Sequence, residues 1–265
     1  MDIPEAESAA TDIFLFAHQD DEYAAFGLLE QTRSAGRVAT CVYLTSGDYG
    51  GQPVAPRNAE SCAVLDSFGV RAERIHFVGE QAAIGDGKLH LHVSRACDLL
   101  VALMRTQGAI AQIYLPAWEG GHQDHDAAHI VGIIAARRLG LIDRAYQFSL
   151  YNGYALPGML FRVMSPLAAN GSPRLLAISP INRMRYVRLC LGYPTQWKTW
   201  MGLFPFVFIQ YVIRGVQAVQ PVSLHRVRER PHEGALLYER RNALRFDEFM
   251  IAVSALLDSD AAVVR

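Results

Sequence analysis

Short apolar runs alternate with helical patterns over the first 150 residues. The predicted strands are Ile13–Ala17, Val38–Leu44, Ile75–Val78, Ile110–Leu115 and Ala145–Leu150. The predicted helices run through Phe26, Leu28 and Leu29 to near Gly36, from Arg57 to Phe68, through Leu99–Met104, and over Ile130–Leu139. Alternation of strands and helices with short connections predicts an α/β fold, with a mainly parallel sheet and helices on both faces.

The second half of the chain has a different charge pattern. From Arg144 to Arg228 there is no Asp or Glu, but there are ten Lys or Arg residues. The uncharged stretch Thr199–Ile213 is too short to span a bilayer and is interrupted by Pro205, so it is either buried or interfacial. Ala235–Leu257 is predicted to be largely helical. We therefore expect a core over residues 1–150 that carries the site, and a C-terminal extension of mixed structure, 151–265, that completes the cleft.

Composition narrows the class of protein. Apolar residues make up 51% and charged residues 19%, which predicts a sizeable core, and the net charge of −1 argues against a nucleic-acid partner. The acidic N-terminal stretch MDIPEAESAATD does not have the pattern of an export signal. Four separated cysteines, Cys41, Cys62, Cys97 and Cys190, fit reduced thiols. We expect a cytoplasmic location, with peripheral contact at the inner membrane face as a hypothesis for the basic half.

Two polar clusters follow predicted strands. His18, Asp20, Asp21 and Glu22 come directly after the first strand, and GGHQDHDAAH at 120–129 comes soon after the fourth. Ligands of open α/β sheets bind beyond the carboxyl ends of strands, where the strand order reverses. The two clusters are therefore expected on one rim of the sheet.

The residue types in these clusters suit a divalent metal. Zinc binds imidazole nitrogen and carboxylate oxygen, and catalytic sites commonly use three protein ligands and a water. His18 and Asp21 can converge on one point, and a third ligand would come from His122, His125 or His129. Asp20 would then be free to act as a general base. The alternative is structural, since an Asp-Asp-Glu run also forms a good helix N-terminus.

The motifs resemble those of a known enzyme family. AHQDDE at 17–22 and GHQDH at 121–125 resemble the AHPDDE and HPDH signatures of the PIG-L/LmbE-like zinc-dependent N-deacetylases. Between them, TSGDYGG and RNAESCAVLDSFGV resemble the family's Gly-acidic loop and Arg-x-x-Glu helix. The resemblance covers residues 12 to about 150. It implies a Rossmann-like fold and an enzyme that removes N-acetyl groups, most often from glucosamine-type sugars.

The resemblance also implies residue roles. The zinc ligands would be His18, Asp21 and His125, and the same ligands accept Fe²⁺. Asp20 would be the general acid/base, His122 would stabilise the oxyanion and leaving group, and Asp124 would orient or tune His122. The chain departs from the family signatures in having Gln19 and Gln123 where proline is usual, which affects loop rigidity.

Three further residues are candidates for substrate binding. Asp48 follows the second strand in a glycine-rich loop, and Asp86 lies in the sequence IGDGKL, where Asp-Gly is first of all a turn signal. Arg57 either contacts a sugar hydroxyl, as the resemblance favours, or forms a solvated ion pair with Glu60.

Other functions stay open at this point. His125 and His129 also fit a metallopeptidase-like pair. A non-catalytic, metal-holding module could bind anionic membranes or partners through residues 183–228. If the protein is an enzyme, the basic second half suggests a substrate that carries phosphate, such as a nucleotide- or lipid-linked sugar. The alternative is that these arginines lie on the surface and pair with carboxylates of the first half. The sequence does not determine the oligomeric state.

Overall fold

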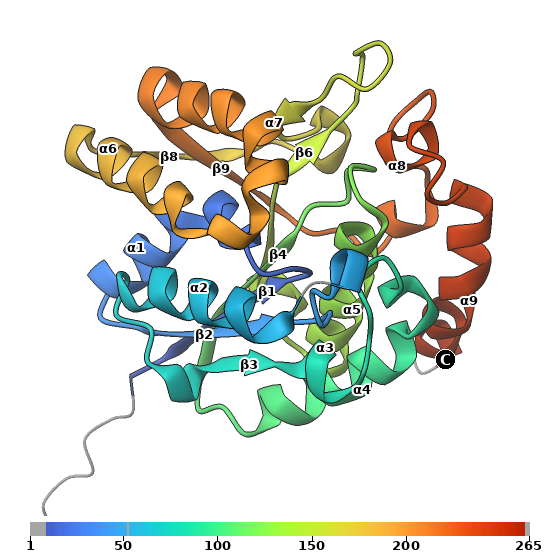
Figure 1. Cartoon of the computed structure of the whole chain (residues 1–265). Helices are drawn as coiled ribbons and strands as arrows, with labels where there is room; N and C mark the ends of the chain where they lie inside the picture. Colours follow the sequence, from blue (N-terminus) through green and yellow to red (C-terminus); the bar gives the residue numbers. More distant parts are fainter. Residues whose placement is uncertain (1–8, 52, 263–265) are drawn as a thin grey trace, which may run out of the picture.

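Both halves of the chain contribute to one central sheet. The computed structural model describes residues 9–51 and 53–262. Its seven-stranded sheet has the order β3-β2-β1-β4-β5-β9-β8 (Figure 1). The strands are β1 Thr11–Phe16, β2 Val38–Tyr43, β3 Ile75–Phe77, β4 Ile110–Pro116, β5 Ala145–Phe148, β8 Arg174–Ala177 and β9 Val216–Pro221. The first five strands pair in parallel, so the predicted α/β fold is confirmed.

The two antiparallel strands of the second half were not predicted from the sequence. β9 pairs with β5 on one side and with β8 on the other. Two of the buried side chains of β9 are Gln217 and Gln220, which donate hydrogen bonds to backbone carbonyls. Because these inward positions are polar, β9 lacks the apolar alternation that identifies a strand. A separate ribbon is formed by β6 Tyr151–Asn152 and β7 Arg162–Val163.

Helices cover both faces of the sheet, because successive strand residues point to opposite sides. In β1, Ile13 and Leu15 join an aliphatic core with α4, α5 and α9, whereas Phe14 and Phe16 join an aromatic core with α1, α2, α6 and α7. The helices are α1 Phe26–Ser34, α2 Val54–Asp66, α3 Val78–Gln81, α4 Val93–Arg105, α5 Gln123–Arg138, α6 Pro180–Leu189, α7 Trp197–Phe208, α8 Leu237–Arg240 and α9 Phe246–Ala262.

Two predicted helices differ more than the others from the bounds in the structure. The segment 235–257 is interrupted between α8 and α9, where the Glu239 carboxylate accepts hydrogen bonds from the backbone N–H groups of Leu236 and Phe246. α5 begins at Gln123, so residues 123–129 of the second polar cluster form its first two turns. Most of the N-terminal stretch considered for an export signal, residues 1–8, lies outside the described residues. Within the described residues, helices long and apolar enough to span a bilayer are absent.

Candidate active site

The two polar clusters meet at a reversal of strand order. β1 and β4 are neighbours in the sheet; the chain continues from β1 to β2 and β3 on one side, and from β4 to β5 on the other. Loops that leave two such strands diverge and leave a crevice at the carboxyl edge. His18 follows β1 and His122 follows β4, so the sheet topology brings these residues together.

The turn after β1 is held by its own carboxylates. Asp21 Oδ2 accepts hydrogen bonds from the backbone N–H groups of Ala17 and His18, at 2.9 and 2.8 Å. Asp20 has a φ of 112°, which is uncommon for a residue with a side chain, and its N–H donates to the carboxylate of Glu22 at 2.7 Å. The turn therefore has a defined shape that presents Asp20 and His18 to the crevice.

The first turn of α5 fixes the second cluster. His122 is the N-cap, and its Nδ1 accepts a hydrogen bond from the Asp124 N–H at 3.2 Å. The preceding loop lies so close to Tyr151 that a Cβ on Gly121 would be 1.9 Å from the Tyr151 carbonyl oxygen, so only glycine fits there. Because Nδ1 of His122 is an acceptor, the hydrogen of the neutral ring is on Nε2, which leaves Nε2 as a donor.

The imidazoles of His18, His122 and His125 form one cluster. The ring centroids are 4.8 Å apart for His18 and His122, 5.3 Å for His18 and His125, and 5.2 Å for His122 and His125. All three residues line a pocket of about 390 Å³, together with Asp20 and Asp21. Five side chains from two distant segments therefore face one space.

The donor atoms in this cluster fit a divalent metal. Two groups of three residues have donor atoms within 4.8 Å of one another: His18, His122 and His125, and His18, Asp86 and Asp124. Asp21, a predicted ligand, is in neither group, but its Oδ1 lies 3.0 Å from His125 Nε2 and its Oδ2 lies 3.8 Å from His18 Nδ1. Nδ1 of His125 is buried and has no hydrogen-bond partner among the described residues. Nitrogen and oxygen donors in this mixture suit Zn²⁺ or Fe²⁺.

Carboxylates set the charge around His18. Burial alone would lower the pKa of His18, but Asp86, Asp124 and Asp21 more than offset it, so the pKa of His18 is raised well above its ordinary value. Burial would raise the pKa of Asp21, but His125 and His18 lower it to about 2. The protein thus keeps anionic charge beside its imidazoles, which is the arrangement that favours a bound cation.

Burial raises the pKa of Asp20, and the nearby Asp21 and Glu22 add to this effect, while Arg57 opposes it. The Arg57 guanidinium lies 3.8 Å from Asp20 Oδ1 and 3.6 Å from Asp86 Oδ2. In the metal-free protein, Asp20 is therefore a carboxyl group whose proton affinity is higher than usual.

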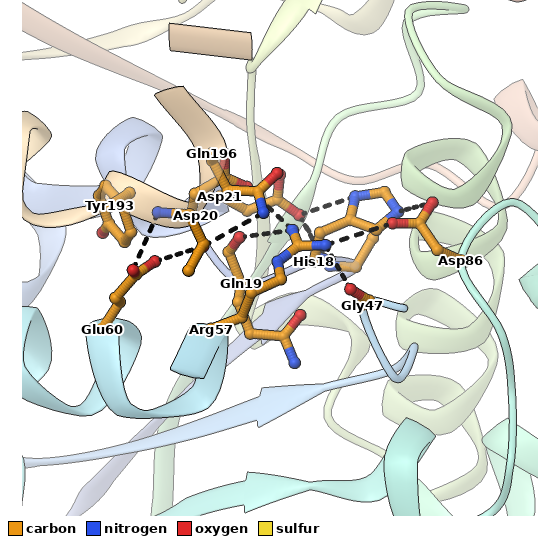
Figure 2. Close-up of polar contacts among 12 residues, drawn as sticks. His18, Gln19, Asp20, Asp21, Gly47, Arg57, Glu60, Asp86, Tyr193 and Gln196 are labelled. Atoms are coloured by element: carbon orange, nitrogen blue, oxygen red, sulfur yellow. Dashed lines mark hydrogen bonds and ion pairs between the residues drawn. The ribbon is translucent and has the colours of Figure 1, made fainter. Parts of the chain in front are cut away.

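Arg57 is buried rather than solvated. Its side chain is 3% exposed, and it donates hydrogen bonds to the carbonyl oxygens of Gln19 and Gly47 (Figure 2). Glu60, the ion-pair partner expected from the sequence, instead accepts hydrogen bonds from the backbone N–H and hydroxyl of Thr195. Arg57 therefore joins the loops after β1 and β2 at the pocket, and a solvated pair with Glu60 is not found.

Asp86 lies closer to the cluster than its turn sequence suggested. Its Oδ1 is 3.4 Å from His18 Nε2, and it lines the pocket. Asp124 Oδ2 is 3.0 Å from the same nitrogen, and its carboxylate also accepts hydrogen bonds from the N–H groups of Gly87 and Leu89. Asp124 thus contacts His18 and the loop of Asp86 through its carboxylate, and it contacts His122 through its backbone N–H. That Asp124 orients or tunes His122 stays a prediction.

Asp48 is exposed and is not among the residues that line the pocket. Its Oδ1 accepts hydrogen bonds from the Ser46 hydroxyl at 2.7 Å and from the Asp86 N–H at 2.9 Å. The structure therefore places Asp48 behind Asp86, where it supports the loop that carries this residue.

His129 lies apart from the cluster. Its Nδ1 hydrogen-bonds the Pro116 carbonyl oxygen at 2.8 Å, and its ring lies against Trp118, with centroids 6.0 Å apart. It neither lines the pocket nor belongs to the groups of candidate metal ligands found in the described residues. The geometry gives no support to a metal site built from His125 and His129.

The second half of the chain supplies much of the pocket wall. Its lining residues are Tyr151, Gln196, Thr199, Leu203, Tyr238, Arg241 and Ala243. The ten basic residues of the segment 144–228 all lie within the described part of the chain, and none of them lines the pocket. Arg241, which was not among the predicted site residues, does line it and lies over the Tyr151 ring, 5.7 Å from its centroid.

Residues 13–136 match the family model of PIG-L, GlcNAc-PI de-N-acetylase. The resemblance predicted from the motifs is confirmed. The matched segment contains both polar clusters and ends inside α5. A match to curated protein sequences was not found.

Solved deacetylase structures share the fold. The A40926 pseudoaglycone deacetylase Dbv21 has a TM-score of 0.60 at 18% identity, over 82% of this chain and 98% of that chain. The zinc-inhibited form of teicoplanin deacetylase Orf2 has a TM-score of 0.61 at 17% identity, over 81% and 98%. The N,N′-diacetylchitobiose deacetylase from Pyrococcus horikoshii has a TM-score of 0.56 at 14% identity, over 81% and 85%. These neighbours show the fold, and the PIG-L match supports the expected class of enzyme, an amide hydrolase of the deacetylase type.

Proposed function

We propose that this protein is a zinc-dependent deacetylase that hydrolyses the N-acetyl group of an amino sugar or sugar conjugate. The observation that carries the proposal is the meeting of three imidazoles from two distant segments in one pocket with Asp20. The PIG-L match and the sugar-related deacetylases with the same fold support the choice of substrate class.

His18, Asp21 and His125 would hold the metal, with Zn²⁺ as the proposed ion and Fe²⁺ as the alternative. The chemistry that a bound zinc ion supplies is polarisation of the acetyl carbonyl and a lowered pKa of water. Asp20 takes a proton from the attacking water and passes it to the departing amine. Nε2–H of His122 donates a hydrogen bond to the oxyanion that develops on the acetyl oxygen.

The pocket wall gives the sugar its position. Arg57 lies beside Asp20 and Asp86 in the first half of the chain, and the second half contributes Tyr151, Tyr238 and Arg241 to the pocket lining. Aromatic faces and planar guanidinium groups suit a hydroxylated ring, which offers an apolar face and hydrogen-bonding edges. We therefore place the sugar between these walls, with its acetamido group toward His18.

Acetate release tests this function. Protein stripped with a chelator and reloaded with zinc should release acetate from N-acetylglucosamine or its conjugates, and Asp20→Asn should abolish this release while keeping bound zinc. Asp66→Asn, an exposed carboxylate at the end of α2 and outside the pocket lining, is the matched control and should stay active. Retained zinc with no acetate release from a panel of N-acetyl sugars would instead favour a metal-holding binding module.

A further inference from the structure

The outward face of α7 is apolar. Trp197, Met201 and Phe208 are 55%, 65% and 38% exposed, and Pro205 between them is also exposed. Positions 197, 201, 205 and 208 share one side of a helix. The opposite side of α7 is buried through Trp200, Leu203 and Val207. A surface helix normally turns polar residues to solvent, so α7 departs from the usual pattern.

Exposed apolar residues also lie on the elements next to α7. Ile209 and Ile213, on the π-helical turn Ile209–Arg214, are exposed, as are Ile181 and Met184 on α6. Figure 1 shows α6 and α7 on the same side of the molecule, away from α8 and α9. α6 and α7 both pack against the turn 209–214, so these exposed apolar side chains lie on neighbouring elements. Exposed apolar side chains that gather in this way mark a candidate interaction site.

Exposed basic residues lie on the same elements as these apolar side chains. Arg188, Lys198 and Arg214 are exposed, and the Lys198 ammonium lies 5.8 Å from the centroid of the Trp197 ring. The segment from residue 144 to residue 228 contains no Asp or Glu, so no acidic residue lies near these three cations along the chain. The surface therefore combines apolar side chains with uncompensated cationic charge.

We propose that the α7 face, defined as Trp197, Met201, Pro205, Phe208, Ile209 and Ile213, docks on membranes that contain anionic lipids. Apolar side chains on one helix face enter the boundary between headgroups and acyl chains, while flanking Lys and Arg contact lipid phosphates. Charge argues against a second copy of the chain as the occupant, because self-association would bring Lys198 and Arg214 against identical cations.

The same helix borders the pocket. Thr199 is exposed and lines the pocket, and Leu203 and Gln196 line it from deeper positions. Thr199 and Leu203 lie on the side of α7 opposite the docking face, so docking would leave the pocket on the far side of this helix from the bilayer.

Vesicle flotation of the full chain tests the docking. We expect binding to vesicles of phosphatidylcholine mixed with phosphatidylglycerol, and much weaker binding to phosphatidylcholine alone. Met201→Glu should weaken binding about tenfold or more, because it removes an apolar side chain that would enter the bilayer and adds an anion. The control is Ile251→Glu on α9, where the side chain is 75% exposed outside this surface, and it should bind like the parent protein.

Three results would overturn the proposal. They are absence of binding to anionic vesicles, binding that Met201→Glu does not weaken, and a dimer seen by sedimentation that Met201→Glu dissociates. Arg214→Glu is a second variant for the case that Met201→Glu does not fold. Its binding should be weaker than that of the parent protein, and the difference should be largest at low salt, where charges are least screened. Acetate release from a soluble N-acetyl sugar reads out the proposed function separately and should be the same in the parent protein and in Met201→Glu.

Discussion

Asp21 Oδ1 lies 3.0 Å from Nε2 of His125, although the two residues are 104 positions apart in the chain. The other oxygen of the same carboxylate holds the N–H groups of Ala17 and His18. One side chain therefore closes the turn after β1 and joins it to α5. This double role gives Asp21 and His125 different expected effects when each is replaced.

Asp21→Ala should lower both zinc content and stability. Loss of the carboxylate leaves two buried N–H groups without an acceptor, which typically costs about 1–3 kcal/mol of unfolding free energy. His125→Ala should also lose zinc but keep these two hydrogen bonds. Zinc content by elemental analysis and urea unfolding of the metal-free proteins separate the two effects. Equal stability of metal-free Asp21→Ala and the parent would contradict the structural part of this prediction.

His122→Ala should reduce kcat and leave zinc in place. A lost oxyanion donor typically costs about 10²–10³ in rate. His122 also caps α5 through its Nδ1, so part of any change could come from the helix end. His122→Asn retains a capping oxygen and serves as the control, because it should fold like the parent and still turn over slowly. Retention of full kcat in His122→Ala would exclude the donor role.

Gln19 and Gln123 stand where the family signatures have proline, and replacing each of them with proline should change the stability of the protein differently. Gln19 Nε2 donates hydrogen bonds to the Ser46 carbonyl oxygen at 3.2 Å and to Asn58 Oδ1 at 2.7 Å. Gln19→Pro removes both, and we expect a loss of about 1–3 kcal/mol. Gln123 is the first residue of α5, where proline is well tolerated, and its Oε1 is buried without a partner among the described residues.

Gln123→Pro should therefore be neutral or stabilise the fold by up to about 1 kcal/mol. Thermal and urea unfolding of the two variants side by side give the comparison. The reverse order, with Gln123→Pro the more damaging substitution, would show that the Gln123 side chain has a structural role that its contacts do not reveal.

Because of His129, the free energy of unfolding should decrease as the pH falls. Burial lowers the pKa of His129 to about 4, below the value of about 6.5 in an unfolded chain. Between these two values the unfolded state binds more protons, so stability is full above pH 6.5 and declines toward pH 4, by up to about 3 kcal/mol.

His129→Asn keeps a donor for the Pro116 carbonyl oxygen but does not titrate. Urea unfolding from pH 7 to pH 4 should show a shallower decline for this variant than for the parent. Parallel curves for the two proteins would mean that His129 does not contribute to the pH dependence.

Part of the site could be predicted because it depends on local sequence. A buried run followed at once by His18 and Asp21 identifies the end of a strand and a turn that carries ligands. The alternation of strands and helices identifies the parallel part of the sheet. The contact of Asp86 with His18 could not be predicted, because an Asp-Gly pair has the same sequence whether its turn lies at the surface or over a pocket. Arg241 could not be predicted because no motif surrounds it.

The amino-acid sequence determined the order of strands and helices in the first half of the chain and the chemical nature of the two polar clusters, because both depend on neighbours a few positions away. Tertiary structure alone decided that Asp124 contacts His18, that Arg57 is buried between two loops, and that strands from the second half extend the sheet. These outcomes depend on which distant segments share a sheet edge or a core, and chain order carries no local signal of that choice.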